Sequence, residues 1–140
     1  MGNQQNDSRE AVFANRVVQV TDYVIIDYAD TTQKLIAWLP AGAVILDVLA
    51  NVTALFDDSG TDYLVVGDSD TEDLYADDID LSAVAMKAES QNTTPVVPGI
   101  RLTADTAIYA KYNGENSNAT AGSAQVSVMW VPSTRKELDT

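Results

Sequence analysis

The fold class of this chain is decided by one stretch, Val44-Ile45-Leu46-Asp47-Val48-Leu49-Ala50-Asn51-Val52-Thr53-Ala54-Leu55-Phe56. Every even position in it is apolar, whereas the odd positions mix apolar residues with Asp47, Asn51 and Thr53. This period of two predicts a β-strand with one face in a core and the other face partly covered. A helix would also place Asp47 and Asn51 on one stripe. The high β-branched content and the turn at Asp57-Asp58-Ser59-Gly60 favour the strand.

Further strands are predicted on both sides of this stretch, because apolar residues alternate there as well. The expected strands cover residues 16–28 with a kink at Thr21-Asp22, 33–39 before the turn Pro40-Ala41-Gly42, 63–67, 99–104, 108–112 and 124–130. Residues 63–67 are expected to return as the second strand of a hairpin. A short helical turn is expected between Ala76 and Lys87.

The fold class that follows is all-β. Seven or eight one-sided strands are buried most economically in two packed antiparallel sheets, a jelly-roll-like β-sandwich with an extended N-terminal arm. We expect an arm at residues 1–14, one domain at 15–132 and a short charged tail at 133–140, since no repeat or linker divides the chain.

The composition excludes several classes of function. The chain has 21 acidic and 8 basic residues and a net charge of −13, which opposes binding to nucleic acid and to anionic membranes. It contains no cysteine and no histidine, so thiolate nucleophiles, zinc–thiolate sites and imidazole bases are excluded. No apolar run is long enough to span a bilayer, and the polar N-terminus does not resemble a signal peptide, so synthesis in a cytoplasm is expected.

An acidic segment, residues 57–80, contains ten carboxylates and no Lys or Arg. Asp68, Asp70 and Glu72 alternate and are weak candidates for a Ca²⁺ site. The EF-hand spacing fails, because Asp73 stands in place of the glycine and Ile79 in place of the bidentate glutamate. We therefore predict no resident cofactor or metal, and a solvated acidic loop or one that meets basic residues of a partner. A glycosidase needs two carboxylates at a set distance, but among so many acids some pair will always lie at that distance. Such a pair is therefore no evidence for catalysis, and no catalytic residue is assigned.

Four residues are candidates for partner binding. Ala11-Val12-Phe13 forms a small apolar cluster in the polar arm, which either frays or becomes ordered against a neighbouring subunit. Trp38 lies beside a proline at a strand end and shares its parity with Lys34 and Ile36, which favours a subunit interface. Trp130 continues the apolar parity of the last strand and is expected in the core. The aromatic residues leave a sugar-stacking platform open as an alternative.

Several segments resemble small structural proteins of tailed bacteriophages. The resemblance lies in Leu39-Pro-Ala-Gly-Ala-Val-Ile-Leu-Asp-Val-Leu-Ala-Asn-Val-Thr-Ala-Leu-Phe-Asp, Thr61-Asp-Tyr-Leu-Val-Val-Gly-Asp, Tyr75-Ala-Asp-Asp-Ile-Asp-Leu, Leu102-Thr-Ala-Asp-Thr-Ala-Ile-Tyr-Ala and Thr120-Ala-Gly-Ser-Ala-Gln-Val. In that group a PAG turn leads into a long strand, and a TAG loop precedes the final strand of a closing hairpin. The resemblance covers roughly residues 35–131.

The resemblance implies a virion component, a decoration or cement protein that binds the major capsid protein lattice of a phage head. It further implies a homo-oligomer, with a trimer favoured, and no catalytic residues. A position on the capsid exterior suits the charge, because an acidic protein beside packaged DNA would be repelled. A neck, tail or head-fibre component is the first alternative, and a carbohydrate-binding module, possibly Ca²⁺-dependent, is the second.

Overall fold

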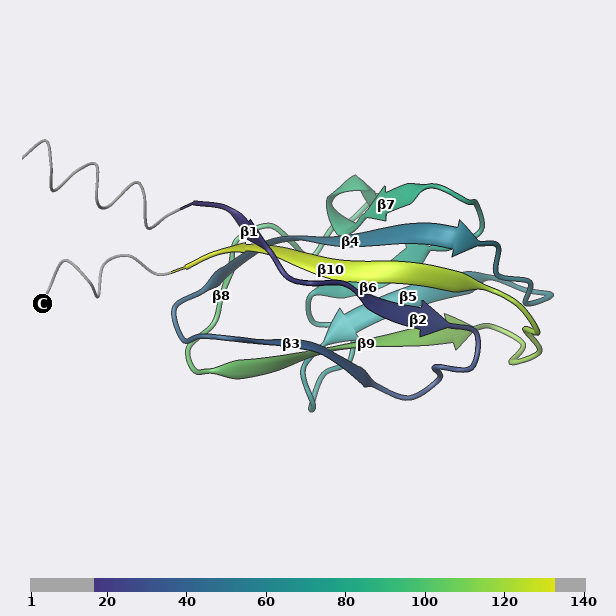
Figure 1. Cartoon of the computed structure of the whole chain (residues 1–140), viewed down its shortest axis with the longest axis horizontal. Coiled ribbons are helices and arrows are strands. Elements are labelled where there is room, and N and C mark those ends of the chain that lie inside the picture. Colours follow the sequence, from purple (N-terminus) through teal and green to yellow (C-terminus); the bar gives the residue numbers. More distant parts are fainter. Residues whose placement is uncertain (1–16, 133–140) are drawn as a thin grey trace, which may run out of the picture.

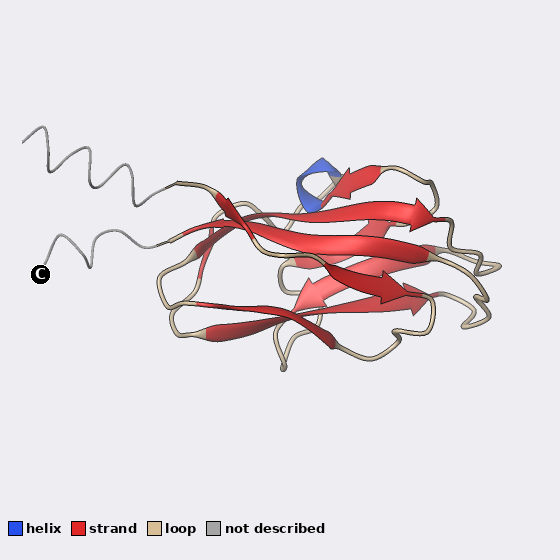
Figure 2. Cartoon of the chain, in the orientation of Figure 1, coloured by secondary structure: helices blue, strands red, loops and turns tan. Residues whose placement is uncertain are grey.

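The computed structural model describes residues 17–132, which form two antiparallel sheets packed face to face (Figure 1). The elements are β1 (Gln19–Val20), β2 (Val24–Asp27), β3 (Lys34–Leu39), β4 (Val44–Ala54), β5 (Asp62–Gly67), β6 (Ala76–Asp80), β7 (Met86–Ala88), η1 (Glu89–Gln91), β8 (Ile100–Arg101), β9 (Thr106–Gly114) and β10 (Ser123–Val131). Within residues 17–132 the only helix is the short η1. Figure 2 shows it beside the strands. The all-β prediction is confirmed.

The strand order is that of a jelly roll. Sheet A has the order β1-β10-β4-β7, with β2 also paired to β10 and β8 also paired to β4, and sheet B has the order β3-β9-β5-β6. The two short strands on β10 share one position, as do the two on β4, so ten strands fill eight positions. The chain changes sheet at almost every connection, which is the jelly-roll pattern. The expected kink at Thr21-Asp22 is the break between β1 and β2.

Two expected hairpins are wrong. β4 lies in sheet A and β5 in sheet B, and β9 and β10 are likewise in different sheets. Alternation identifies each strand but carries no information about which layer the next strand joins. Here the connection from β4 passes Phe56, which is buried and stacks on Tyr112 of β9 with ring centroids 4.8 Å apart. Phe56, just after β4, thus packs across the core against sheet B rather than against a hairpin partner in sheet A.

The helical turn expected between Ala76 and Lys87 is also wrong, since this segment holds β6 and β7. Its buried residues Ala76 and Ile79 are three positions apart, a spacing that resembles a helix. The register of β5 against β6 shifts between these two residues, and Asp78 has a φ of 60°. A β-bulge therefore produces the helix-like spacing.

A second bulge interrupts the alternation of β4. Val48, Ala50 and Val52 are buried as predicted, but at the start of the strand Ile45 is fully buried while Val44 and Leu46 are only half-buried. The register against β10 shifts at this point, from Asp47 opposite Met129 to Ile45 opposite Trp130. Because one extra residue exchanges the faces, the prediction that all even positions enter the core is wrong here.

The core lies between the sheets and consists of the inward residues of both. β10 contributes Ala124, Val126 and Val128, all fully buried, and Trp130 is half-buried against the same core, as expected for the parity of this strand. Gly122, just before β10, has a φ of 135°, and a Cβ there would lie 2.3 Å from the Phe56 ring. Only glycine lets the loop close over this ring.

Candidate partner-binding surface

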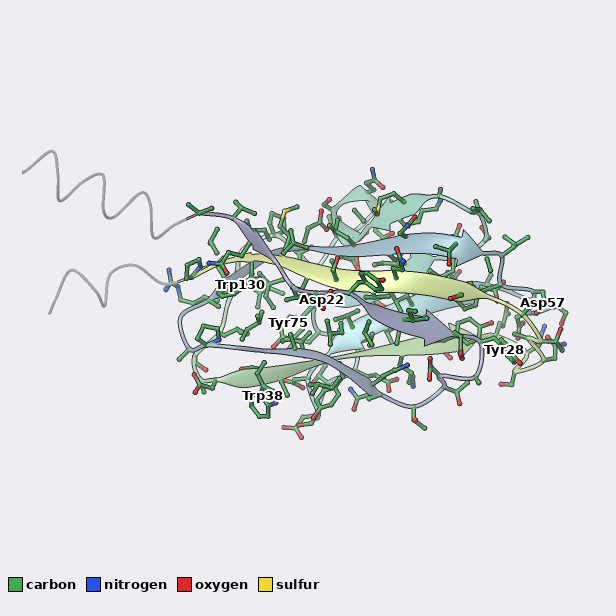
Figure 3. The ribbon with its side chains drawn as sticks, viewed as in Figure 1. Asp22, Tyr28, Trp38, Asp57, Tyr75 and Trp130 are labelled. Carbon is green, nitrogen blue, oxygen red and sulfur yellow. The ribbon has the colours of Figure 1, made fainter. Side chains whose placement is uncertain are left out.

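Trp38 is the most exposed large apolar side chain of the described residues, at 66%. It lies on β3, the edge strand of sheet B, and Figure 3 shows it on the outer side of that strand. A register shift between Leu35 and Ala37 leaves Leu35 and Trp38 outside while Leu39 is buried. The bulge therefore places Leu35, which has the opposite sequence parity, on the same outer side as the indole.

The surroundings of Trp38 are held in place by the turn that follows. Trp38, Leu39, Pro40 and Asp105 line a shallow pocket of about 370 Å³. The Asp105 carboxylate accepts a hydrogen bond from the backbone N–H of Ala41 at 2.9 Å, which fixes the turn. An exposed indole on a fixed turn presents apolar area at low conformational cost, a common property of residues that anchor interfaces.

Most exposed apolar side chains lie along one margin of the sandwich. This margin is formed by β1, β2 and β3, the edge strands of the two sheets, which contact each other. Its exposed members are Val17, Val18, Val20, Tyr23, Ile25, Tyr28, Leu35 and Trp38. Lys34 bridges the two edges, donating to the carbonyl of Ile25 at 2.8 Å and lying 3.5 Å from the Asp30 carboxylate. The sequence prediction included only Trp38 of this margin.

The three arm residues Ala11, Val12 and Phe13 lie outside the described residues. The described chain begins at Val17 and ends at Pro132, and Gln19 is paired with Trp130. Both ends of the described chain therefore lie at the same end of the sandwich (Figure 1).

The weak Ca²⁺ candidates lie in the β5–β6 loop, where each has its own environment. Asp68 accepts the backbone N–H groups of Asp70 and Thr71 at 2.9 and 2.7 Å, which closes the loop on itself. Glu72 instead accepts from Lys111 on β9 at 2.7 Å. Across residues 17–132, no group of three or more acidic side chains is arranged to hold a metal ion. The geometry of the described residues thus gives the Ca²⁺ candidates no support.

Part of the acidic segment is structural rather than solvated, which corrects the loop prediction for Asp58. This side chain is buried and accepts the backbone N–H groups of Gly60, Asn116 and Asn118 at 2.8 to 3.1 Å. Burial would raise its pKa, but these hydrogen bonds outweigh burial and lower it. Asp57 similarly accepts from Thr120 and Ala121, and these bonds lower its pKa.

Asp62 is the second buried carboxylate of this segment. It accepts a short hydrogen bond from the Tyr112 hydroxyl and a longer one, 3.2 Å, from the backbone N–H of Asp58. Burial and the nearby carboxylate raise the pKa of Tyr112 well above its usual value, so the phenol stays protonated. Asp57 and Asp58 join the β4–β5 loop to the β9–β10 loop, and Asp62 joins β5 to β9. Figure 3 shows Asp57 at the end opposite Trp130.

Glu89 is a fully buried carboxylate that no sequence pattern singles out. It accepts a short hydrogen bond from the backbone N–H of Asp77 and another from the Asn92 side chain at 2.6 Å. Burial raises its pKa, and the nearby Asp77 and Asp47 carboxylates act in the same direction. Its contacts join β6 to η1, so its role is structural.

The charge of the molecule is concentrated in the described domain. Residues 17–132 contain 17 of the 21 acidic and 4 of the 8 basic residues. No helix among these residues is long and apolar enough to cross a membrane. The described domain thus has two kinds of surface, a strongly acidic one and the apolar margin.

Comparison with known proteins gives a fold and no family. No family model matches the chain, and no curated protein matches it. Among solved structures, a chain of the "Cyanophage Pam1 capsid asymmetric unit" is similar, with a TM-score of 0.60, 18% identity and coverage of 84% of this chain and 86% of that one. A chain of the "Acidic stable capsid structure of Helicobacter pylori bacteriophage KHP30" has a TM-score of 0.52, 16% identity and coverage of 82% and 93%. The jelly-roll fold described above is therefore also present in chains of two phage capsid structures.

Proposed function

We propose that this chain is a non-enzymatic structural protein of a phage particle, specifically a decoration or cement protein that binds the major capsid protein lattice. The observation that carries the proposal is the match of the fold over nearly the whole length of both partners, up to 93% of the capsid chain. The likeness is to a complete small chain rather than to a domain of a larger enzyme.

Charge supports a position on the outside of the shell. A described domain with 17 acidic and 4 basic residues would be repelled by packaged DNA but not by solvent. The absence of histidine and cysteine from the sequence supports a role without catalysis. In this role the protein requires no cofactor or metal. It is made in the host cytoplasm before it joins the virion.

The proposed protein acts as a homo-oligomer, with a trimer favoured, that contacts several shell subunits. Each copy then needs only a modest contact, because simultaneous binding by linked copies supplies avidity. The contact residues in the proposal are Trp38 and the arm residues Ala11, Val12 and Phe13. Trp38 supports this assignment by its exposure on a fixed turn.

A neck, tail or head-fibre component shares the same fold argument and remains the alternative. Copy number separates the two, because lattice decoration needs one oligomer for each lattice site, whereas a neck or fibre needs few copies. Quantitative mass spectrometry of purified particles, relative to the major capsid protein, measures this ratio.

The direct test adds the purified protein to particles stripped of it and measures bound copies by co-sedimentation. Trp38→Ala should weaken binding about tenfold or more, as expected for a central aromatic anchor. Leu55→Ala is the matched control, because Leu55 is also half-exposed but lies outside the margin, after β4. Undiminished binding by both Trp38→Ala and a variant lacking residues 1–14 would contradict the assigned contacts, and failure of the unaltered protein to bind would contradict the proposed function.

A further inference from the structure

The outer face of sheet A is almost free of charge in an otherwise strongly acidic molecule. β10, a central strand, contains no Asp, Glu, Lys or Arg, and its neighbour β4 contains only Asp47. The outer face of sheet B differs, since Lys111 and Glu72 form an ion pair there. Depletion of charge is typical of the buried centre of a protein–protein interface.

One row of side chains crosses the whole face. Gln125 of β10 lies opposite Ile25 of β2 on one side and Asn51 of β4 on the other, and Asn51 lies opposite Met86 of β7. Gln125 points outward, because its neighbours Ala124 and Val126 are buried in the core. Ile25 and Met86 are 48% and 60% exposed, and the central amides bond to each other at 3.1 Å.

The adjoining rows of outward side chains are also uncharged apart from Asp47. Ser127 of β10 lies opposite Leu49, which lies opposite Ala88, and Met129 lies opposite Val20. The charge of Asp47 is engaged within the chain, because its carboxylate accepts the backbone N–H and the hydroxyl of Ser90 at 3.0 and 2.6 Å. The remaining acids near this face, Asp22 and Asp27, lie in and beside the edge strand β2. The margin also carries the exposed Arg101 of β8, opposite Val44. The face is therefore neutral at its centre and charged only at its margin.

We infer that this face binds a second copy of the same chain, with the equivalent faces of the copies turned toward a shared symmetry axis. Two molecules of net charge −13 repel each other, and this face lets them meet without opposing carboxylates. The central amides Asn51 and Gln125 suit a symmetric contact, because each carries both donors and an acceptor and can pair with its own equivalent. A basic partner would instead be attracted to the acidic surfaces.

The dimensions of the face are sufficient for a specific contact. β10 and β4 are nine and eleven residues long, and the shorter β1, β2, β7 and β8 flank them. Four strand positions about 4.8 Å apart therefore cover at most roughly 20 by 30 Å, or about 600 Å² for each copy. Two such faces bury about 1,200 Å² together, the lower end of the range for specific interfaces. The inference deepens the homo-oligomer of the proposed function by assigning its interface, and it rests on that part of the proposal alone.

The test is the solution mass of the full-length protein by sedimentation velocity over a range of concentrations. The unaltered protein should have the mass of two or three copies, and Ile25→Glu combined with Met86→Glu should weaken association at least tenfold. Both positions are exposed, so the fold should survive, which circular dichroism checks. Leu35→Glu combined with Trp38→Glu is the matched control on the margin of sheet B, and it should leave the mass unchanged.

A monomeric mass for the unaltered protein at every concentration would overturn the inference. So would association that survives the sheet A substitutions, or that both pairs of substitutions weaken equally. Because no capsid is present, the result is independent of lattice binding. Protein that associates through sheet A but fails to bind particles would contradict the proposed function while supporting the interface.

Discussion

At the scale of single residues, the buried carboxylates explain how an acidic chain stabilises the loops at one end of the sandwich. Asp58 and Asp62 use their oxygens to bind backbone N–H groups and a phenol across two loops that are far apart in sequence. Hydrogen bonds to a charged acceptor are stronger than neutral ones, and a partner left unpaired in a buried site costs more still. The Tyr112–Asp62 contact should therefore be a large contributor at this end of the sandwich.

Tyr112→Phe should lower the free energy of unfolding by about 1–3 kcal/mol, because it removes a donor from the buried Asp62 carboxylate. Urea unfolding followed by circular dichroism measures the change. Tyr109→Phe is the matched control on the same strand, since Tyr109 is half-buried on the outer face and should lose little. Equal losses for the two variants would contradict the importance assigned to this bond.

The raised pKa of Glu89 makes the stability of the fold depend on pH with the opposite sign to the lowered pKa values of Asp57 and Asp58. Its pKa is raised above the unfolded value of 4.5, so above that pH the unfolded chain releases a proton that the folded chain retains. Stability is therefore lost as the pH rises from 4.5 through the raised pKa of Glu89. The lowered pKa values of Asp57 and Asp58 instead make stability fall as the pH drops from 3.8 through those lowered values. Nearby Asp77 and Asp47 strengthen the effect at Glu89.

Glu89→Gln removes this titration while it keeps an oxygen for the backbone N–H of Asp77. Urea unfolding at about pH 4 and about pH 7 should show the variant gaining stability over the unaltered protein at the higher pH. A stability difference that is the same at both pH values would refute the raised pKa of Glu89.

At the scale of elements, bulges decide which face of a strand enters the core. Alternation in the sequence predicts the strand at residues 44–56 but cannot reveal the register shift that exchanges Ile45 and Leu46. For the same reason, alternation in the sequence did not predict the exposure of Leu35 on β3 or the bulge in β6. The existence of strands is a local property, whereas a bulge depends on the partner strand, which a single sequence does not identify.

Ile45→Ala should therefore destabilise the protein by about 2–5 kcal/mol, and Leu46→Ala by clearly less. The two positions are adjacent and of equal size, so thermal and urea unfolding of both variants isolates the effect of burial. Simple alternation along β4 predicts the reverse order, and that reverse order would contradict the bulge.

The candidate site was partly predictable for similar reasons. Trp38 stands out in the sequence because it is a large aromatic residue beside a proline, whereas Tyr23 and Ile25 join the same margin only through the pairing of β2 with β10. Glu89 carries no sequence signal, because its burial depends on the contact between η1 and β6. The lack of charge in residues 48–56 and 121–132 was visible, but only the register places these segments side by side.

At the scale of the whole molecule, three surfaces differ in their physical character. Most of the surface is acidic, which opposes binding to nucleic acid. The edge strand β3 with Trp38 is proposed to contact the shell, and the neutral face of sheet A, which includes Ile25, is inferred to join copies. This division would let an acidic protein oligomerise and bind a lattice without placing like charges in contact. Chains of two phage capsid structures share the jelly-roll fold on which these surfaces lie.

The central claim, that the chain is a lattice-bound component of a phage head, is tested most directly by electron cryomicroscopy of the particle whose genome encodes it. The account predicts this jelly roll on the outer surface of the shell, repeated at every equivalent lattice site, with Trp38 turned toward the major capsid protein. Particles that lack the protein, or that carry it only at one vertex or inside the shell, would contradict the claim.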